Sequence, residues 1–287
     1  MPNSYFNNKK VLVIADAGKN FIMKEDADIL LCLDEAKNLA RSAQRAGVDV
    51  IKFQIHVFED EQYVRSEKRY DWIKMNERLT PYDDFWKPLA EFCKDLGLVF
   101  CVTPMSRMAA EKISDLVDIF KIGSADIVND DLLHYVSAQK KPVIISSGMS
   151  TVEESDNAFA LLHAANTDFA VLHCTSIYPC PIYKLNLNMV KALGFRYPST
   201  PIGFSDHSQS TKIGAMAVRL GATLIEKHFT LDKQAFGPDH HMAMGFDEMK
   251  EYIEHIRDEE LELFAYGSND KILYPEELAF HENFRKS

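Results

Sequence analysis

The chain has no apolar run long enough to cross a membrane as a helix, and its N-terminal segment, MPNSYFNNKK, lacks the apolar stretch of a secretory signal. It also lacks an excess of positive charge. Its 43 acidic and 32 basic side chains give a formal net charge of -11, which argues against nucleic acid and anionic membranes as partners. An anionic substrate stays compatible with this composition, because a local basic pocket can lie inside an acidic protein.

Cysteine is scarce and scattered, and no spacing suggests a disulfide framework. The five residues are Cys32, Cys93, Cys101, Cys174 and Cys180. An odd number of cysteines, two of them inside apolar segments, favours buried free thiols. We therefore expect a protein of the reducing cytoplasm.

Eight short apolar runs do recur, and nearly every one ends on a polar or ionisable residue. They span residues 11–16, 48–54, 98–103, 117–124, 142–147, 169–176, 201–207 and 223–229. Segments with helical periodicity separate most of them, at 29–46, 83–96, 105–116, 130–139, 152–164, 184–193, 209–220 and 246–255. This alternation predicts an α/β fold, a (β/α)8 or TIM barrel, as a single domain over residues 1–287. The polar tail at 267–287 is expected to pack outside the barrel.

One connection is unusually long. The 27 residues at 55–81 separate the second strand from its helix, which exceeds an ordinary βα loop. The segment carries Tyr70 and Trp72 among many charges. Two interpretations stay open: a lid or subunit contact, and an excursion that covers the barrel flank.

Alternation along the strands identifies candidates for an anion site. If Val48 and Val50 fill the barrel, then Lys52 and Gln54 point into its mouth, and the same alternation brings Lys121 there from the fourth strand. A buried lysine is costly unless it meets an anion. Hydroxyl groups also gather at the strand ends: Thr103, Ser124, Ser146, Ser147 and Ser205. Together these residues predict a phosphate or carboxylate site.

A second group of candidates lies on the last two strands. His207 ends the seventh strand and His228 the eighth, so the two imidazoles could share one metal ion. Two histidines are equally compatible with structural hydrogen bonding. Glu226 lies deeper on the same face as His228 and could orient a ligand, and Asp239 could support the site. Asp16, at the end of the first strand, could act as an acid or base.

The order of these segments resembles a known family. The segments are VDVIKFQIHVFEDE, YDDFWKPLAEFCKDLGLVFCVTP, FKIGSADI, KPVIISSGMST, HCTSIYPCP, IGFSDHS, IEKHFTLD and GPDHHMAM. They resemble the sialic acid synthase family, the synthases of N-acetylneuraminate and related nonulosonic acids. The resemblance implies a transferase that condenses phosphoenolpyruvate with the aldehyde of a sugar, commonly an N-acetylhexosamine. A 2-keto-3-deoxy sugar acid and phosphate are the implied products.

The resemblance also implies roles for particular residues. His207 and His228 would bind the divalent metal, Mn2+ in first place and Mg2+ as the alternative. Asp16, Lys121 and Asp126 would stand at catalytic positions. The remaining positions would bind substrate: Lys52, Thr103, Ser124, Tyr178 and Ser205 on the phosphoenolpyruvate side, Gln54, Ser146 and Asp239 facing the sugar or a metal-bound water, and Ser176 on the sixth strand. A homodimer is compatible with the resemblance.

The chain departs from the family pattern at several positions. Asp16 replaces a Glu and Phe21 a His, Asp126 replaces a Glu, and Ser176 replaces an Asn. The antifreeze-like domain that typically follows the barrel in this family is not expected here. We therefore expect the phosphoenolpyruvate half to be retained and the acceptor sugar to differ.

Two other classes of function stay open from the sequence. One is a Schiff-base aldolase that uses Lys121 or Lys52 as its nucleophile. The other is a non-catalytic relative that binds a sugar acid or a partner protein.

Overall fold

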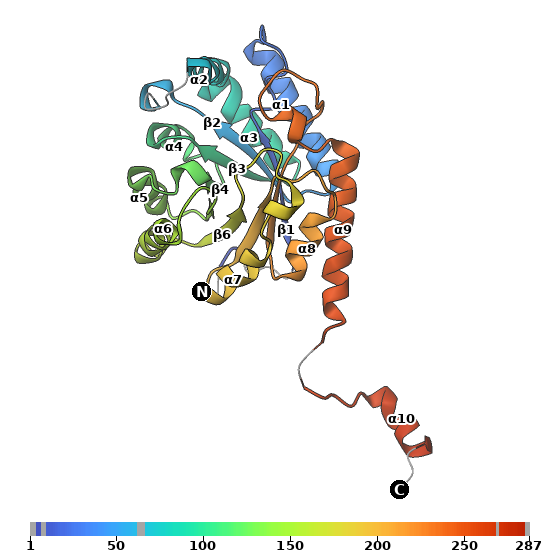
Figure 1. The fold of residues 1–287 in the computed structure, drawn as a ribbon. Coiled ribbons are helices and arrows are strands. Elements are labelled where there is room, and N and C mark those ends of the chain that lie inside the picture. The colour runs from blue at the N-terminus through green and yellow to red at the C-terminus, as the bar shows by residue number, and fades with distance from the viewer. Residues whose placement is uncertain (1–3, 7–9, 62–66, 268–269, 285–287) are drawn as a thin grey trace.

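The computed structural model describes residues 4–6, 10–61, 67–267 and 270–284. Its centre is a closed, all-parallel barrel in which consecutive strands are neighbours and β8 pairs with β1 (Figure 1). The strands are β1 Leu12–Gly18, β2 Val50–Ile55, β3 Val99–Pro104, β4 Ile119–Ile122, β5 Val143–Ser146, β6 Phe169–Cys174, β7 Ile202–Asp206 and β8 Leu224–His228. The predicted (β/α)8 barrel is confirmed, with each strand inside or within two residues of its apolar run.

Helices surround the barrel (Figure 1). They are α1 Ile29–Ala46, α2 Glu67–Leu79, α3 Lys87–Asp95, α4 Arg107–Ile113, α5 Asp130–Ala138, α6 Val152–Ala164, α7 Asn188–Arg196, α8 Ile213–Arg219, α9 Phe246–Phe264 and α10 Pro275–Phe284. The bounds of α1 and α6 match the prediction. The Asp28 side chain accepts a hydrogen bond from Leu31 N at the start of α1, and Gly47 ends that helix at φ +95°. The helix α9 continues nine residues beyond the predicted end at His255.

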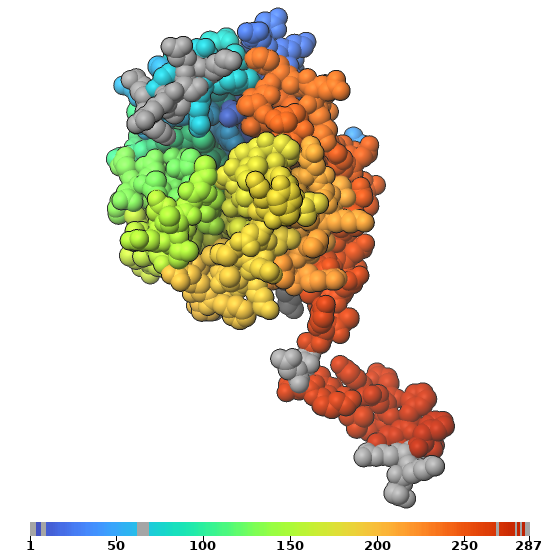
Figure 2. All heavy atoms as spheres, viewed as in Figure 1, coloured from blue at the N-terminus to red at the C-terminus, as the bar shows by residue number. Residues whose placement is uncertain are grey.

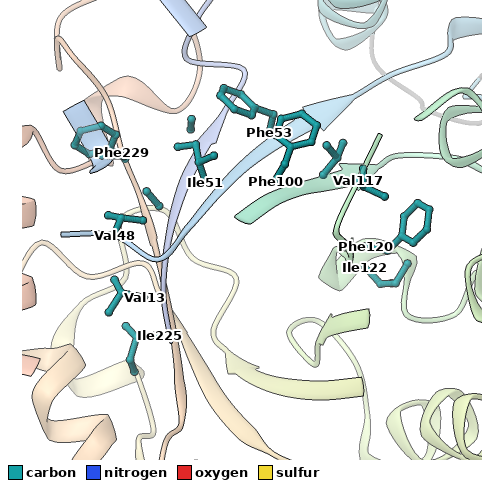
Figure 3. Close-up of a cluster of buried hydrophobic side chains, with 14 of the residues drawn as sticks. Val13, Val48, Ile51, Phe53, Phe100, Val117, Phe120, Ile122, Ile225 and Phe229 are labelled. Atoms are coloured by element: carbon teal, nitrogen blue, oxygen red, sulfur yellow. The ribbon is translucent and has the colours of Figure 1, made fainter. Parts of the chain in front are cut away.

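The apolar side chains form two layers, as strand alternation requires. An inner cluster fills the barrel with residues such as Ile14, Val50 and Ile119. A larger outer cluster packs the strands against the helices, and Figure 3 shows part of it. Val48 belongs to this outer cluster, so the expectation that it fills the barrel is wrong. The reason is that β2 begins at Val50, and Val48 therefore does not follow the alternation of the strand.

The long connection after β2 reaches the mouth of the barrel. It contains a 3-10 turn, Phe58–Asp60, and the helix α2, which the sequence did not predict. Trp72 of α2 stacks on Phe236 of the loop after β8, with ring centroids 5.1 Å apart. This contact joins two segments that are distant in sequence. Because Trp72 also lines the cavity at the mouth, it favours the interpretation as a lid over that of an excursion covering the barrel flank.

The tail lies apart from the barrel. Figure 1 shows α10 beyond the end of α9, with no barrel element beside it, and Figure 2 shows the same separation in space-filling form. Its apolar side chains, among them Leu278 and Phe280, are exposed. The tail therefore lies outside the barrel, but its described residues 270–284 do not pack against it. Within the described part of the chain, no helix is both long and apolar enough to span a membrane.

Candidate active site

A cavity of about 570 Å³ lies at the carboxyl ends of the strands. In Figure 2 the surface is hollowed between the cyan α2 region, the orange residues after β8 and the yellow residues near 180. Nearly all of the predicted site residues line this cavity: Asp16, Lys52, Gln54, Thr103, Lys121, Ser124, Asp126, Ser146, Tyr178, Ser205, His207, His228 and Asp239. The position agrees with the rule that TIM barrels place their active sites at this face.

Lys52 lies at the centre of a buried charge network. Its Nζ is 2.8 Å from Asp16 Oδ2 and 3.7 Å from Glu226 Oε2, and it donates to Thr103 Oγ1 at 3.3 Å. The strand register places Asp16 of β1 beside both Lys52 of β2 and His228 of β8. Each of these side chains is therefore held by a barrel strand, which makes the arrangement rigid.

Lys121 approaches the Glu226 carboxylate from the opposite side of the barrel. Its Nζ is 3.8 Å from Glu226 Oε2, and it donates to Ser146 Oγ at 2.7 Å and to the Ile122 carbonyl at 3.1 Å. Ser205 donates to the other oxygen of Glu226 at 2.8 Å. Glu226 thus binds between the two lysines, where the sequence had suggested only a supporting role for it.

These charges shift one another's pKa values. Burial alone would raise the pKa of Asp16, but Lys52 and His228 outweigh burial and hold it below the usual value. Burial likewise opposes the ionisation of Glu226, and Lys121 and Lys52 lower its pKa nevertheless. For Lys52, the effect of burial is outweighed by Asp16 and Glu226, which raise its pKa. Burial lowers the pKa of Lys121, so Lys121 is the more easily deprotonated lysine.

The two predicted histidines lie side by side, with ring centroids 5.5 Å apart. His207 Nδ1 is 3.0 Å from the Thr175 carbonyl, which favours a proton on Nδ1 and leaves the Nε2 lone pair available. His228 Nδ1 is 3.5 Å from Asp16 Oδ2. The Tyr178 ring packs on His207 at 4.2 Å between centroids. A hydrogen bond from the second ring nitrogen to a carbonyl, as in His207, is typical of histidines that bind metals, whereas His228 Nδ1 has no hydrogen-bond partner among the described residues.

The surroundings of the pair fit a metal that takes further ligands from water and substrate. Among the described residues, no group of three His, Cys, Asp or Glu side chains could hold a metal ion by itself. Asp16 Oδ1 and Glu226 Oε2 are buried and make no hydrogen bond within the described part of the protein. Buried acceptors without partners indicate that a polar ligand belongs in the cavity.

Ser147, one of the hydroxyl groups expected at the anion site, does not line the cavity and donates to the Leu172 carbonyl at 3.2 Å. Ser176 is the other predicted residue that does not line it. It stands beside Cys174, with Ser176 Oγ 3.7 Å from Cys174 Sγ. Cys174 lines the cavity and is 3.8 Å from His207 Nδ1. A β-carbon on Gly148 would come within 2.4 Å of Ser176 Oγ and 2.7 Å of Ser124 Oγ. Because Gly148 has no side chain, the hydroxyls of Ser176 and Ser124 can pack closely against it in this part of the cavity wall.

Two further acidic residues line the cavity. Asp126 ends a 3-10 turn, Ser124–Asp126, that follows β4 directly. Burial raises the pKa of Asp126 to about 6, although a hydrogen bond from Asn129 opposes the shift. Burial would also raise the pKa of Asp239, but Lys19 outweighs it and lowers that pKa. The cavity therefore holds Asp239 as a carboxylate and Asp126 as a group that can exchange a proton near neutral pH.

Several lining residues were missed from the sequence. They are Lys19, Arg69, Trp72, Met105, Gly123, Ala125, Met149, Cys174 and Pro238. Lys19 directly follows Gly18, the last residue of β1. Its charge at the end of a strand was the sequence signal that could have identified it. Arg69 and Trp72 come from the long connection, where the mixture of aromatic and charged residues was the available signal.

The fold and this site define the class of protein: a (β/α)8-barrel enzyme whose site is built from strand-end residues. The chain belongs to the NeuB family, whose model matches residues 39–268. It is 32% identical to the N-acetylneuraminate-9-phosphate synthase of Mus musculus over 285 residues, which covers 96% of this chain and 76% of the relative. It is 33% identical to the N,N'-diacetyllegionaminic acid synthase of Legionella pneumophila, with 96% of this chain and 78% of the relative covered.

A solved structure supports the same assignment. The sialic acid synthetase of Leptospira borgpetersenii, crystallised with citrate, aligns with a TM-score of 0.84 at 27% identity. The alignment covers 97% of this chain and 93% of that chain. The prediction of an enzyme like the sialic acid synthases is thereby confirmed, and its reaction class is that of a sugar-acid synthase.

Proposed function

We propose that the enzyme condenses phosphoenolpyruvate with an aldose, an N-acetylhexosamine or a related sugar, in a metal-dependent aldol-type reaction. The products are a 2-keto-3-deoxy sugar acid of the sialic or nonulosonic type and inorganic phosphate. The observation that carries the proposal is the joining of Lys52 and Lys121 with two imidazoles in one cavity. The names of the two relatives described above, both synthases of such acids, support the product class.

The donor half of the site would bind the phosphate and carboxylate of phosphoenolpyruvate. Lys52 and Lys121 would hold these anions, with hydrogen bonds from Thr103, Ser124 and Ser205. Tyr178 belongs to the same half. The lysines are already in place because Glu226 and Asp16 bind them in the unliganded protein. Such fixed charges stabilise developing negative charge without reorganisation during the reaction.

The acceptor half would hold the sugar near Gln54, Ser146 and Asp239. When bound by His207 and His228, a divalent metal, Mn2+ in first place and Mg2+ as the alternative, would supply Lewis-acid polarisation of the sugar aldehyde. Both histidines are buried, so water has limited access to this position.

The chemistry then forms one C–C bond and one C–O bond, the latter from water, and breaks the C–O bond to phosphate. The enol carbon attacks the aldehyde carbon, water adds to the neighbouring carbon that bears the phosphate, and phosphate leaves with its bridging oxygen. Asp16 would accept the proton of the incoming water, because Lys52 keeps Asp16 ionised. Asp126, with its pKa of about 6, would exchange a proton on the acceptor side. Lys121 would stabilise the departing phosphate.

The test is release of inorganic phosphate from phosphoenolpyruvate with a panel of aldoses and Mn2+. The proposal predicts release that depends on one class of aldose and stops when a chelator is added. Phosphoenolpyruvate that binds and is never cleaved with any aldose would refute the synthase, and would favour a non-catalytic binding protein.

One observation favours the alternative of a Schiff-base aldolase. Burial lowers the pKa of Lys121, and a readily deprotonated lysine is a better nucleophile. Treatment with borohydride and a carbonyl substrate separates the two mechanisms. Covalent trapping at Lys121 that is unaffected by chelator would support the aldolase, and its absence would leave the metal-dependent condensation.

The compartment is part of the proposal. All five cysteines are free and buried, as predicted. Free thiols fit a cytoplasmic enzyme, since a reducing compartment keeps them in this state.

A further inference from the structure

A buried ion pair lies directly behind the two histidines. Asp206 of β7 and Lys227 of β8 are register partners, with Lys227 Nζ 3.1 Å from Asp206 Oδ2. Both side chains are almost completely buried, at 1% exposure each. By strand alternation both side chains point outward to the helices. The residue that follows each of them, His207 or His228, points into the cavity.

The pair belongs to a closed hydrogen-bond network. Tyr252 of α9 donates its hydroxyl to Asp206 Oδ2 at 2.9 Å, and Asp206 Oδ1 accepts from Ser208 N at 2.8 Å. Lys227 donates to the Ser208 carbonyl. Tyr252 can approach because a β-carbon on Gly214 would lie 2.5 Å from its ring. Every charged atom of the pair therefore has a fixed partner, from β7, β8, the turn after β7 or α9.

The two histidines belong to the same segments as this network. His207 lies between Asp206 and Ser208, and His228 ends β8. The His207 carbonyl accepts from Cys180 N at 2.8 Å, and the His228 carbonyl accepts from Met244 N at 2.9 Å. These hydrogen bonds fix the backbone of both histidines on the side that faces away from the cavity. The distance between the two imidazoles therefore depends on this backbone.

The pair is hard to explain by stability alone. A buried ion pair often contributes no more than well-packed apolar residues of the same size, because both charges lose their hydration. Apolar residues would also pack well at these two positions, because the neighbouring residues of the outer cluster, Phe204 and Ile225, are apolar. What an ion pair adds is a defined direction and distance between two strands.

We propose that the Asp206–Lys227 pair, held by Tyr252, is a positioning device that sets the separation of His207 and His228 for a shared divalent metal. This inference rests on the metal dependence proposed above. The three residues touch neither substrate nor metal in this role. They act through the backbone of the strand ends.

The test measures binding of Mn2+ by electron paramagnetic resonance, with no turnover needed. The variant Asp206→Asn/Lys227→Met removes both charges, so neither is left unpaired, and Asn keeps an acceptor for the Ser208 amide. The milder variant Tyr252→Phe removes one hydroxyl. The control is Tyr197→Phe, which removes a hydroxyl bound to Asp156 far from the cavity.

We expect the double variant to bind Mn2+ about tenfold more weakly, the usual effect of losing a group that orients a metal ligand. Tyr252→Phe should shift affinity in the same direction by less, and Tyr197→Phe should leave it unchanged. Affinity for phosphoenolpyruvate without metal, measured by calorimetry, should stay at the parent value in all three. This contrast separates positioning of the histidines from a general loosening of the barrel.

Parental Mn2+ affinity in Tyr252→Phe and in the double variant would overturn the inference. So would an equal loss of Mn2+ and phosphoenolpyruvate affinity, since that result means a merely structural role. If the double variant does not fold, Tyr252→Phe decides the question alone. A parent protein that binds no Mn2+ would instead refute the proposed metal itself, a result that is distinguishable from the others.

Discussion

Gly148 provides a sharp test of how tightly the cavity wall is packed. It follows β5, and a β-carbon there would lie 2.4 Å from Ser176 Oγ, 2.7 Å from Ser124 Oγ and 2.9 Å from Cys174 Sγ. The Ser176 hydroxyl would have to retreat by about 1 Å to reach ordinary contact. The backbone is not strained, since Gly148 is not among the residues with positive φ. The effect of Gly148→Ala is therefore steric.

Inserting a methyl group into such a wall costs about 1 to 3 kcal/mol of folding free energy. Because Ser124 belongs to the proposed donor half, we also expect kcat/KM for phosphoenolpyruvate to fall about tenfold, equivalent to about 1.4 kcal/mol. Urea denaturation and phosphate release measure the two effects. The matched control is Gly194→Ala in α7, where a β-carbon meets nothing within 4 Å. That variant should gain about 0.5 to 1 kcal/mol. Parental stability and kinetics in Gly148→Ala would refute the reasoning.

Three further predictions concern charge and metal. Lys52→Met leaves the buried Asp16 carboxylate without its main partner and removes one of the two lysines beside Glu226, so urea denaturation should show a loss of about 3 to 5 kcal/mol. Lys52→Met/Asp16→Asn should recover part of it. Burial raises the pKa of Glu61 to about 8 from 4.5, so its contribution to stability is complete below pH 4.5 and is lost as pH rises through about 8. Glu61→Gln should keep the hydrogen bond to His56 and remove this loss, and a Tm difference that does not grow with pH would contradict it. Saturating Mn2+ at about 100 times its Kd should stabilise the protein by about 2.7 kcal/mol, reversibly with chelator, and an unchanged Tm would argue against the metal.

The barrel was predictable because its signals are local and repeated. Apolar runs that alternate with helical periodicity specify strands and helices wherever both faces are buried, and Gly47 marked the end of α1. The prediction failed where periodicity is weak. The helix α2 has few apolar residues, and α10 buries no face against the barrel, so neither shows the pattern that packing imposes.

The site residues on the strands were likewise predictable, whereas those on the long connection were not. Alternation correctly placed Lys52, Lys121 and His228 in the cavity, because a barrel strand fixes which side chains point inward. Arg69 and Trp72 come from the connection after β2, whose return to the mouth depends on long-range contacts such as the stacking on Phe236. No short-range pattern encodes such contacts, and these two lining residues were therefore missed.

The central claim is that the cavity joins phosphoenolpyruvate to an aldose by cleaving the C–O bond to phosphate. The most direct measurement runs the reaction in water labelled with 18O and analyses the released phosphate by mass spectrometry. Because water adds to carbon and phosphate leaves with its own bridging oxygen, we predict phosphate without label, formed only when aldose and Mn2+ are present. Labelled phosphate would mean hydrolysis at phosphorus, and unlabelled phosphate released without an aldose would mean hydrolysis that is not coupled to condensation. Either result would contradict the account.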